Sequence, residues 1–221
     1  MSSLNYNLFA YYIKVLLVFY FTISICFNLE AQNLKNGDLI FQLSGNSEFS
    51  KAISEATACD GELDFSHVGI IFIDENNDKQ VIEASPTEGV RIIPLADFKK
   101  LALKIDGKPA LLVKRLIVDI DFNEAIKRAK MLIGEEYDWW FLPNNDKIYC
   151  SELVYESFID ENGAHVFSSN PMNFRAKDGT MPLYWVQLFG GKEENVPEGI
   201  EGTNPNDLSK DFRLMEVYRF F

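Results

Sequence analysis

Short hydrophobic runs separated by polar turns divide the chain into segments that favour β-strands. The run at 68–73 is rich in β-branched and apolar residues, which is typical of a strand buried on both faces. A polar turn separates it from the apolar run at 81–84, so the two runs predict a β-hairpin. Strands are predicted at 37–43, 68–73, 81–84, 89–95, 110–117 and 212–221.

Three other segments have the apolar spacing of helices, namely 49–57, 122–133 and 150–159. Asp121 is a candidate N-cap for the second helix and Gly134 its stop, while Gly163 is expected to end the third. The stretch from 167 to 211 is rich in Pro, Gly and Asn and is predicted to be mostly loop, with a helical turn at 183–189. This order of elements predicts an α+β fold with a mostly antiparallel sheet and helices on one side.

The first 31 residues differ from the rest and are predicted to be a signal peptide. Lys14 is followed by an uncharged apolar stretch at 15–27, which is shorter than the roughly 20 residues of a membrane-spanning helix. Ala31 offers a cleavage site, so residues 32–221 are expected to form a single exported domain without stable membrane insertion. The alternatives are an uncleaved anchor starting near Leu8 and a lipoprotein modified at Cys26.

Composition narrows the classes of function. Hydrophobic residues make up 47% of the 221 residues and charged residues 24%, as in a globular protein of one domain. The formal net charge of −12 argues against nucleic acid and anionic lipid surfaces as partners. Three cysteines and two histidines exclude a Cys-rich zinc site and leave little room for a His-rich metal centre.

Cys150 and His67 are the candidate catalytic residues. Cys150 begins a predicted helix, where the positive end of the helix dipole favours the nucleophilic thiolate. A buried cysteine that only packs as a small hydrophobe is the alternative interpretation. His67 lies at the start of an apolar strand, where an imidazole can reach a neighbouring helix. The other histidine, His165, is predicted to lie in a loop without a partner.

Glu83 is the candidate third member of a catalytic triad. It is the only charged residue in its apolar strand, and burying a carboxylate is costly unless it is paired. His67 on the adjoining strand is the natural partner. The two share a face, directly opposite or diagonal, only if the hairpin loop has an odd number of residues, such as five. Glu83 would then orient the imidazole and stabilise its charged form.

These residues and their neighbours resemble one known family. The pattern comprises Gly37-Asp38-Leu39-Ile40-Phe41, Phe65-Ser66-His67-Val68-Gly69-Ile70, Ile82-Glu83-Ala84, Gly134-Glu135-Glu136-Tyr137-Asp138 and Tyr149-Cys150-Ser151-Glu152-Leu153-Val154. It is similar to the YiiX/YaeF-like, circularly permuted branch of the NlpC-type, papain-like cysteine peptidases and amidases. The resemblance covers roughly residues 34–158, and more weakly Pro205-Asn206-Asp207-Leu208.

The resemblance implies a fold in which the cysteine-bearing helix packs against an antiparallel sheet or open barrel. It implies that Cys150 is the nucleophile, His67 the base and Glu83 the orienting acid, and that Tyr137 faces the substrate or the oxyanion. It also implies hydrolysis of amide bonds through a thioester, without a metal or organic cofactor. Asp38 is expected to be structural.

For an exported enzyme of this kind, cell-wall peptides such as peptidoglycan fragments are the expected substrate. The alternatives are a lipid-directed acyltransferase or thioesterase, for which the aromatic run 139–141 would suit an acyl chain, and an inactive binding module. Cys150 is expected to be a reactive thiol rather than the disulfide partner of Cys59.

Overall fold

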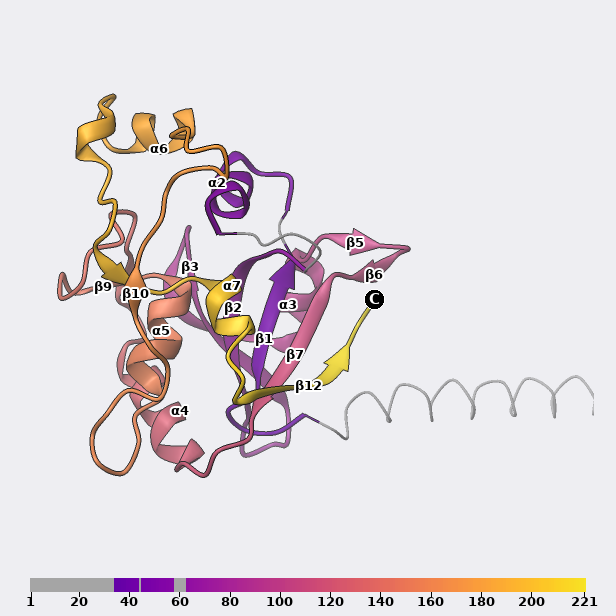
Figure 1. The fold of residues 1–221 in the computed structure, drawn as a ribbon. Helices are drawn as coiled ribbons and strands as arrows, with labels where there is room; N and C mark the ends of the chain where they lie inside the picture. The colour runs from indigo at the N-terminus through magenta and orange to yellow at the C-terminus, as the bar shows by residue number, and fades with distance from the viewer. Residues whose placement is uncertain (1–33, 44, 58–62) are drawn as a thin grey trace, which may run out of the picture. The chain divides into compact units, whose positions relative to one another are not determined.

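A six-stranded antiparallel sheet forms the centre of the computed structural model, which describes residues 34–43, 45–57 and 63–221 (Figure 1). The chain divides into two units after Leu34. All of the strands, helices and site residues described below belong to the unit Lys35–Phe221. The predicted signal peptide and Cys59 lie outside the described residues. The sheet has the strand order β12-β7-β1-β2-β3-β4. Its strands are β1 (Leu39–Leu43), β2 (Phe65–Ile73), β3 (Lys79–Ser85), β4 (Gly89–Pro94), β7 (Leu111–Leu116) and β12 (Leu214–Arg219).

The predicted hairpin is confirmed as β2 and β3, joined by the five-residue loop 74–78. Ile70 pairs with Ile82 in this antiparallel register, so the next pair along the two strands is Gly69 and Glu83. A Cβ atom on Gly69 would lie 2.6 Å from Val81 Cγ1, so only glycine allows β3 this close an approach. The register therefore puts His67 and Glu83 in the diagonal arrangement on one face.

Both faces of the central strands are covered. Ile70 and Ile71 are neighbours in β2, point to opposite faces, and are both 0% exposed. The prediction of a strand buried on both faces is confirmed.

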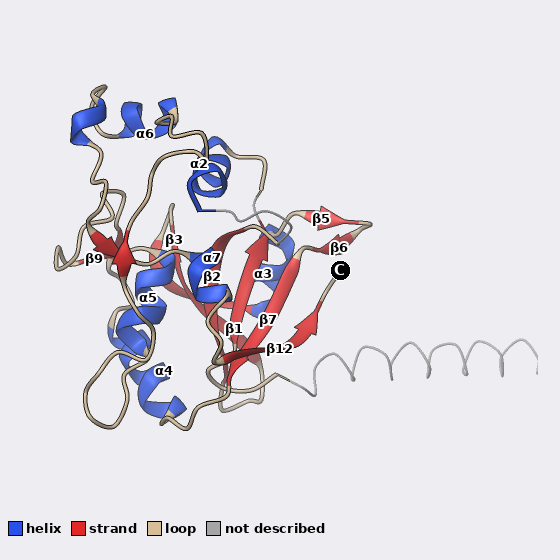
Figure 2. Cartoon of the chain, in the orientation of Figure 1, coloured by secondary structure: helices blue, strands red, loops and turns tan. Residues whose placement is uncertain are grey.

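The helices lie around this sheet (Figure 2). The predicted helices are present as α2 (Glu48–Thr57), α4 (Phe122–Met131) and α5 (Cys150–Ser157), and the predicted helical turn is α6 (Leu183–Leu188). Asp121 caps α4 as expected, because its Oδ1 accepts from the Asn123 and Glu124 N–H groups. The helix α5 packs against α4, β2 and β3, which positions its first residue near the catalytic candidates on the sheet.

The end of α5 differs from the prediction. The helix stops at Ser157 rather than near residue 159, since Phe158 leaves the helical conformation with ψ 87° and is completely buried. Gly163 lies further on, in a turn closed by the bridge between Ile159 and His165. His165 was predicted to lack a partner, and this is wrong. Its Nδ1 lies 3.0 Å from the Tyr155 carbonyl oxygen, and its ring stacks on that of Tyr155.

Several short elements were not predicted. The helix α3 (Leu95–Leu101) follows β4, and the long 167–211 stretch contains the 3-10 helix η1 (Glu193–Asn195) and the helix α7 (Pro205–Ser209). Three two-stranded pairs complete the unit, formed by β5 (Lys104–Ile105) and β6 (Lys108–Pro109), β8 (Glu136–Tyr137) and β9 (Lys147–Ile148), and β10 (Asn170–Pro171) and β11 (Glu201–Gly202).

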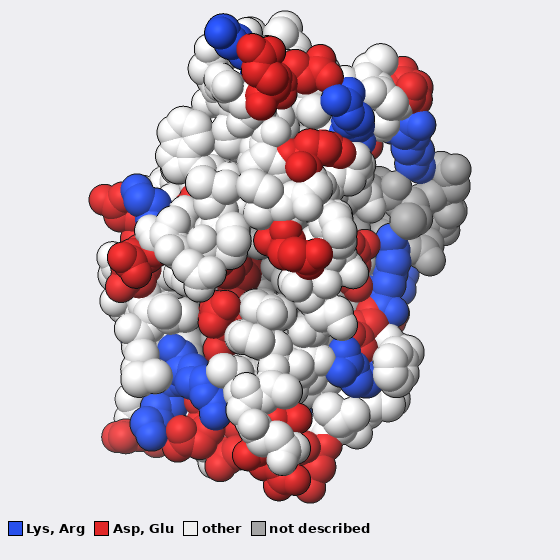
Figure 3. Space-filling model, turned by 60° about the vertical axis from the view of Figure 1, so that its left-hand side comes forward, with Lys and Arg blue, Asp and Glu red and all other residues white. Residues whose placement is uncertain are grey.

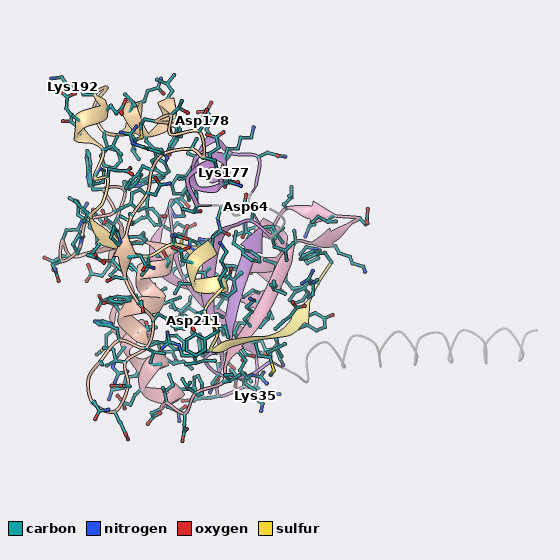
Figure 4. The ribbon with its side chains drawn as sticks, in the orientation of Figure 1. Lys35, Asp64, Lys177, Asp178, Lys192 and Asp211 are labelled. Atoms are coloured by element: carbon teal, nitrogen blue, oxygen red, sulfur yellow. The ribbon has the colours of Figure 1, made fainter. Side chains whose placement is uncertain are left out.

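Hydrogen bonds of the Asn206 side chain connect α7 to β2 and to the end of α2. It is fully buried, its Oδ1 accepts from the Phe65 N–H at 2.7 Å, and its Nδ2 donates to Thr57 Oγ1 at 2.8 Å. Nδ2 also donates to Asp64, which is labelled beside α2 in Figure 4. The C-terminal segment is thereby held against β2 and the end of α2.

Asp38 has the structural role expected of it. It is 1% exposed and accepts from Arg115 Nε at 2.7 Å and Nη2 at 2.8 Å. Its Oδ2 also accepts from the Lys35 N–H at 2.7 Å, so the carboxylate joins the turn before β1 to β7.

The surface reflects the acidic composition. In Figure 3, Asp and Glu side chains gather along the lower end of the face shown. A surface of this sign repels the phosphates of nucleic acids. Along the described ranges, no helix is both long enough and apolar enough to cross a membrane.

Candidate active site

Cys150 is the first residue of α5 and is 3% exposed. The first N–H groups of a helix have no acceptor within the helix, so the start of α5 offers free donors and a positive dipole end beside the thiol. Cys150 is a free thiol in the structure, whereas Cys59, its predicted non-partner, lies outside the described residues. The chemistry of a thiolate nucleophile needs this kind of position.

His67 and Glu83 form a direct pair. His67 Nε2 lies 2.6 Å from Glu83 Oε2, and the side chains are 14% and 4% exposed. The prediction that they share one face of adjacent antiparallel strands is confirmed. The His67 ring also stacks on Phe98 of α3, with ring centroids 5.8 Å apart. The imidazole is therefore held at one nitrogen by a carboxylate and on one ring face by an aromatic side chain.

Both proposed partners affect the pKa of His67. Burial alone lowers the pKa of His67, but hydrogen bonds to Cys150 and Glu83 and attraction to their negative charges outweigh burial and raise it to about 10. The pKa of Glu83 responds in the opposite direction. Burial raises it, whereas the bonds and charges of His67 and Arg91 lower it below its usual value. At neutral pH the pair of His67 and Glu83 is therefore favoured as imidazolium and carboxylate.

Arg91 is a member of the site that the sequence analysis missed. It lies on β4 directly opposite Glu83, and its Nε and Nη2 donate to Glu83 Oε1 at 2.9 and 2.7 Å. Arg91 also pairs with Glu88. Arg91 was the only charged residue in the predicted strand 89–95, which was the available signal.

Tyr137, which the resemblance implies faces the substrate or the oxyanion, lies beside Cys150. Both side chains line one cavity, and Tyr137 is 5% exposed. Burial, and then the negative charge of Cys150, raise the pKa of Tyr137 well above its usual value. The phenol therefore keeps its proton at neutral pH and can act as a hydrogen-bond donor.

Glu152 is a second buried carboxyl group near the start of α5. It accepts from the Tyr149 N–H at 3.3 Å. Burial raises the pKa of Glu152 to about 8, and the charges of Asp138 and Glu156 add to the increase. The group is largely uncharged at neutral pH, so it does not oppose a thiolate at Cys150.

The cavity beside Cys150 is small and mostly apolar. Its volume is about 50 Å³, enough for a few water molecules. The aromatic run 139–141 contributes only Phe141 to its wall. Trp139 packs against Tyr137 and Phe49, and Trp140 is 48% exposed. Across the described residues, no group of three or more His, Cys, Asp or Glu side chains is arranged to hold a metal ion.

A cysteine at the start of a helix, packed on an antiparallel sheet that carries a His–carboxylate pair, defines the class of papain-like cysteine hydrolases. The family model of the permuted papain-like amidases, the YaeF/YiiX or C92 family, matches residues 33–218. The chain belongs to this family. It is therefore a cysteine hydrolase of the amidase type, as the sequence predicted.

Two relatives agree with this assignment. The uncharacterized protein YiiX of Escherichia coli K12 is 33% identical over 166 residues, which cover 74% of this chain and 75% of the relative. The crystal structure of YiiX from Escherichia coli O157:H7, described as a metalloprotein, has a TM-score of 0.69 at 24% identity. That comparison covers 86% of this chain and 99% of the other, and it supports the fold.

Proposed function

We propose that this chain is an exported hydrolase that cleaves amide bonds in cell-wall peptides through Cys150, His67 and Glu83. The observation that carries the proposal is the position of His67. One imidazole is bonded to Glu83 at 2.6 Å and interacts with the free thiol of Cys150 beside a cavity. A thiolate–imidazolium pair oriented by a carboxylate is the arrangement that acyl transfer to a cysteine needs.

The reaction begins when the Cys150 thiolate attacks the amide carbonyl carbon and forms a carbon–sulfur bond. The oxyanion that results accepts hydrogen bonds from the Cys150 N–H and the Tyr137 hydroxyl. One such donor is commonly worth about 3 kcal/mol of transition-state stabilisation. The imidazolium of His67 then donates its proton to the amide nitrogen, and the carbon–nitrogen bond breaks to release the amine.

Water completes the cycle. His67, now neutral, takes a proton from a water molecule that attacks the thioester carbonyl. Collapse of the second tetrahedral intermediate releases the carboxylic acid and restores the thiolate and the imidazolium. The structural relative is described as a metalloprotein, but the described side chains here include no metal-binding cluster. No step of this mechanism passes through a metal ion.

The family match favours an amide over a lipid substrate. The family model that covers residues 33–218 is that of permuted papain-like amidases. Only Phe141 of the aromatic run 139–141 is among the described residues that line the cavity beside Cys150, so the run offers little surface to an acyl chain there. These observations support the amide proposal over the acyltransferase or thioesterase alternative.

Parallel assays with muropeptides and acyl esters test the reaction, with Cys150→Ala as the matched control. We expect Cys150-dependent cleavage of the peptides only. Turnover of esters alone would replace the proposal with the lipid-directed alternative. Absence of Cys150-dependent turnover on both would favour a binding module.

Export is part of the proposal and rests on the apolar stretch before Ala31. Intact-mass analysis of the protein from its native host is expected to show a mature chain that starts near Gln32. Full-length protein in the membrane fraction would mean a retained anchor, and a lipid on Cys26 would mean a lipoprotein.

A further inference from the structure

Three buried polar atoms on the wall of the cavity beside Cys150 lack a hydrogen-bond partner among the described residues. They are the hydroxyl of Ser151, which is 1% exposed, the indole N–H of Trp185, which is 2% exposed, and the hydroxyl of Thr203, which is 7% exposed. Ser151 follows Cys150 on α5, whereas Trp185 comes from α6 and Thr203 follows β11, both far away in the sequence. An unpaired buried polar group costs free energy, so three on one wall point to a ligand that pairs with them.

Other polar side chains on the same wall are already used within the protein. Thr57 donates to the Ile53 carbonyl oxygen at 2.8 Å. Asn173 donates to the Ala56 carbonyl oxygen at 2.7 Å, and Asn204 accepts from the Asp207 N–H at 2.8 Å. The hydroxyls of Ser151 and Thr203 and the indole N–H of Trp185 are therefore available for a ligand.

The rest of the wall sets the charge of that ligand. Apolar side chains form most of it, and none of the described lining residues is Asp, Glu, Lys, Arg or His. A charged side chain of the substrate would find no oppositely charged residue of these types in the wall, so its burial would cost much free energy.

We infer that this cavity is a specificity subsite for a short, uncharged side chain that ends in a carboxamide. The indole of Trp185 can only donate, and so it pairs with the carbonyl oxygen of the ligand. The Ser151 and Thr203 hydroxyls can accept from the two N–H bonds of the amide NH₂ group. The apolar walls contact the carbon atoms between. This inference rests on the proposed function, because it places the group next to the scissile amide.

Peptides that differ in one residue test the inference. Asparagine, leucine and aspartate side chains have the same number of non-hydrogen atoms, and each is placed in turn on either side of the scissile amide. We expect kcat/KM for the asparagine peptide to exceed that for leucine by about tenfold or more, because the leucine leaves all three polar atoms unpaired. The aspartate peptide is expected to be the poorest, since its charge would be buried.

Variants of two of the three polar residues separate recognition from stability. Trp185→Phe and Ser151→Ala are each expected to lower kcat/KM for asparagine about tenfold and to leave leucine within about twofold. Trp139→Phe is the matched control, because Trp139 belongs to the same aromatic cluster but does not line the cavity. Equal losses for both peptides, or equal rates in the wild type, would overturn the subsite.

A binding measurement distinguishes failure of this inference from failure of the proposed function. Calorimetry with Cys150→Ser needs no turnover and compares the same asparagine and leucine peptides. If no peptide is cleaved but asparagine still binds more tightly, and Trp185→Phe abolishes the difference, the subsite stands without the hydrolase. If neither peptide binds, or both bind alike, the subsite is wrong.

Discussion

Arg91 holds the carboxylate oxygen of Glu83 that His67 does not use. Two guanidinium nitrogens of Arg91 donate to Glu83 Oε1, while His67 contacts Oε2. Glu83 is thus fixed between a cation and an imidazole at a position that is 3% exposed. We regard Arg91 as a positioning residue, since it acts on the reaction through Glu83.

Replacement of Arg91 is therefore expected to weaken the site without touching substrate. Arg91→Met should lower kcat/KM about tenfold and shift the acidic limb of the pH–rate profile to higher pH, because the pKa of Glu83 rises when the guanidinium is lost. Arg91→Lys should restore part of the activity. Arg219→Met, which breaks an exposed pair with Glu216, is the control. An unchanged profile in Arg91→Met would contradict the positioning role.

The alkaline limit of activity is expected near pH 10. The pKa of His67 is raised from 6.5 to about 10, so the imidazolium is favoured in the folded protein. Its contribution to stability is fully present below pH 6.5 and is lost as the pH rises through about 10. Urea unfolding and kcat/KM measured from pH 6 to 10.5 check both effects.

His67→Gln should lack this part of the pH dependence of stability, whereas the exposed His165→Asn should keep it. If kcat/KM of the wild type instead changes with a pKa near 6.5, the imidazole of His67 is not held as an ion pair.

Cys150 is expected to react with iodoacetamide at mildly acidic pH far faster than Cys59. His67→Ala should slow the labelling of Cys150 roughly tenfold, because the thiolate loses its cationic partner. Glu83→Ala should slow it less, since Glu83 acts through His67. Peptide mapping by mass spectrometry gives the rate at each cysteine. Equal labelling of both thiols, or no effect of His67→Ala, would refute the Cys–His pair.

Glu152 is expected to make the protein less stable at alkaline pH. Its folded pKa of about 8 lies above the unfolded value of 4.5, so stability falls as the pH rises through this window. Glu152→Gln should remove that loss and keep the acceptor for the Tyr149 N–H. Urea midpoints at pH 5 and pH 9 measure the difference, with Glu156→Gln on the same helix as the control. If the wild type and Glu152→Gln lose the same stability between pH 5 and pH 9, Glu152 is not protonated in the folded protein.

Much of the fold could be predicted because its signals are local. The apolar run of β2, the five-residue turn and the run of β3 together specify a hairpin and its face. Asp121 marks the start of α4 by its capping oxygen. The candidate pair of His67 and Glu83 followed from one lone carboxylate in an apolar strand, because burial of a charge requires a partner.

The amino-acid sequence alone determined the strands, the main helices, the family and three candidate catalytic residues, since each depends on periodicity or on a motif along the chain. The tertiary structure decided what depends on contacts between distant segments. It brought Arg91 opposite Glu83, and it placed Trp185 of α6 in the same cavity wall as Ser151 of α5. Contacts between side chains of different elements form only when the elements pack together. The local preferences of each segment do not specify which distant residue will be its neighbour.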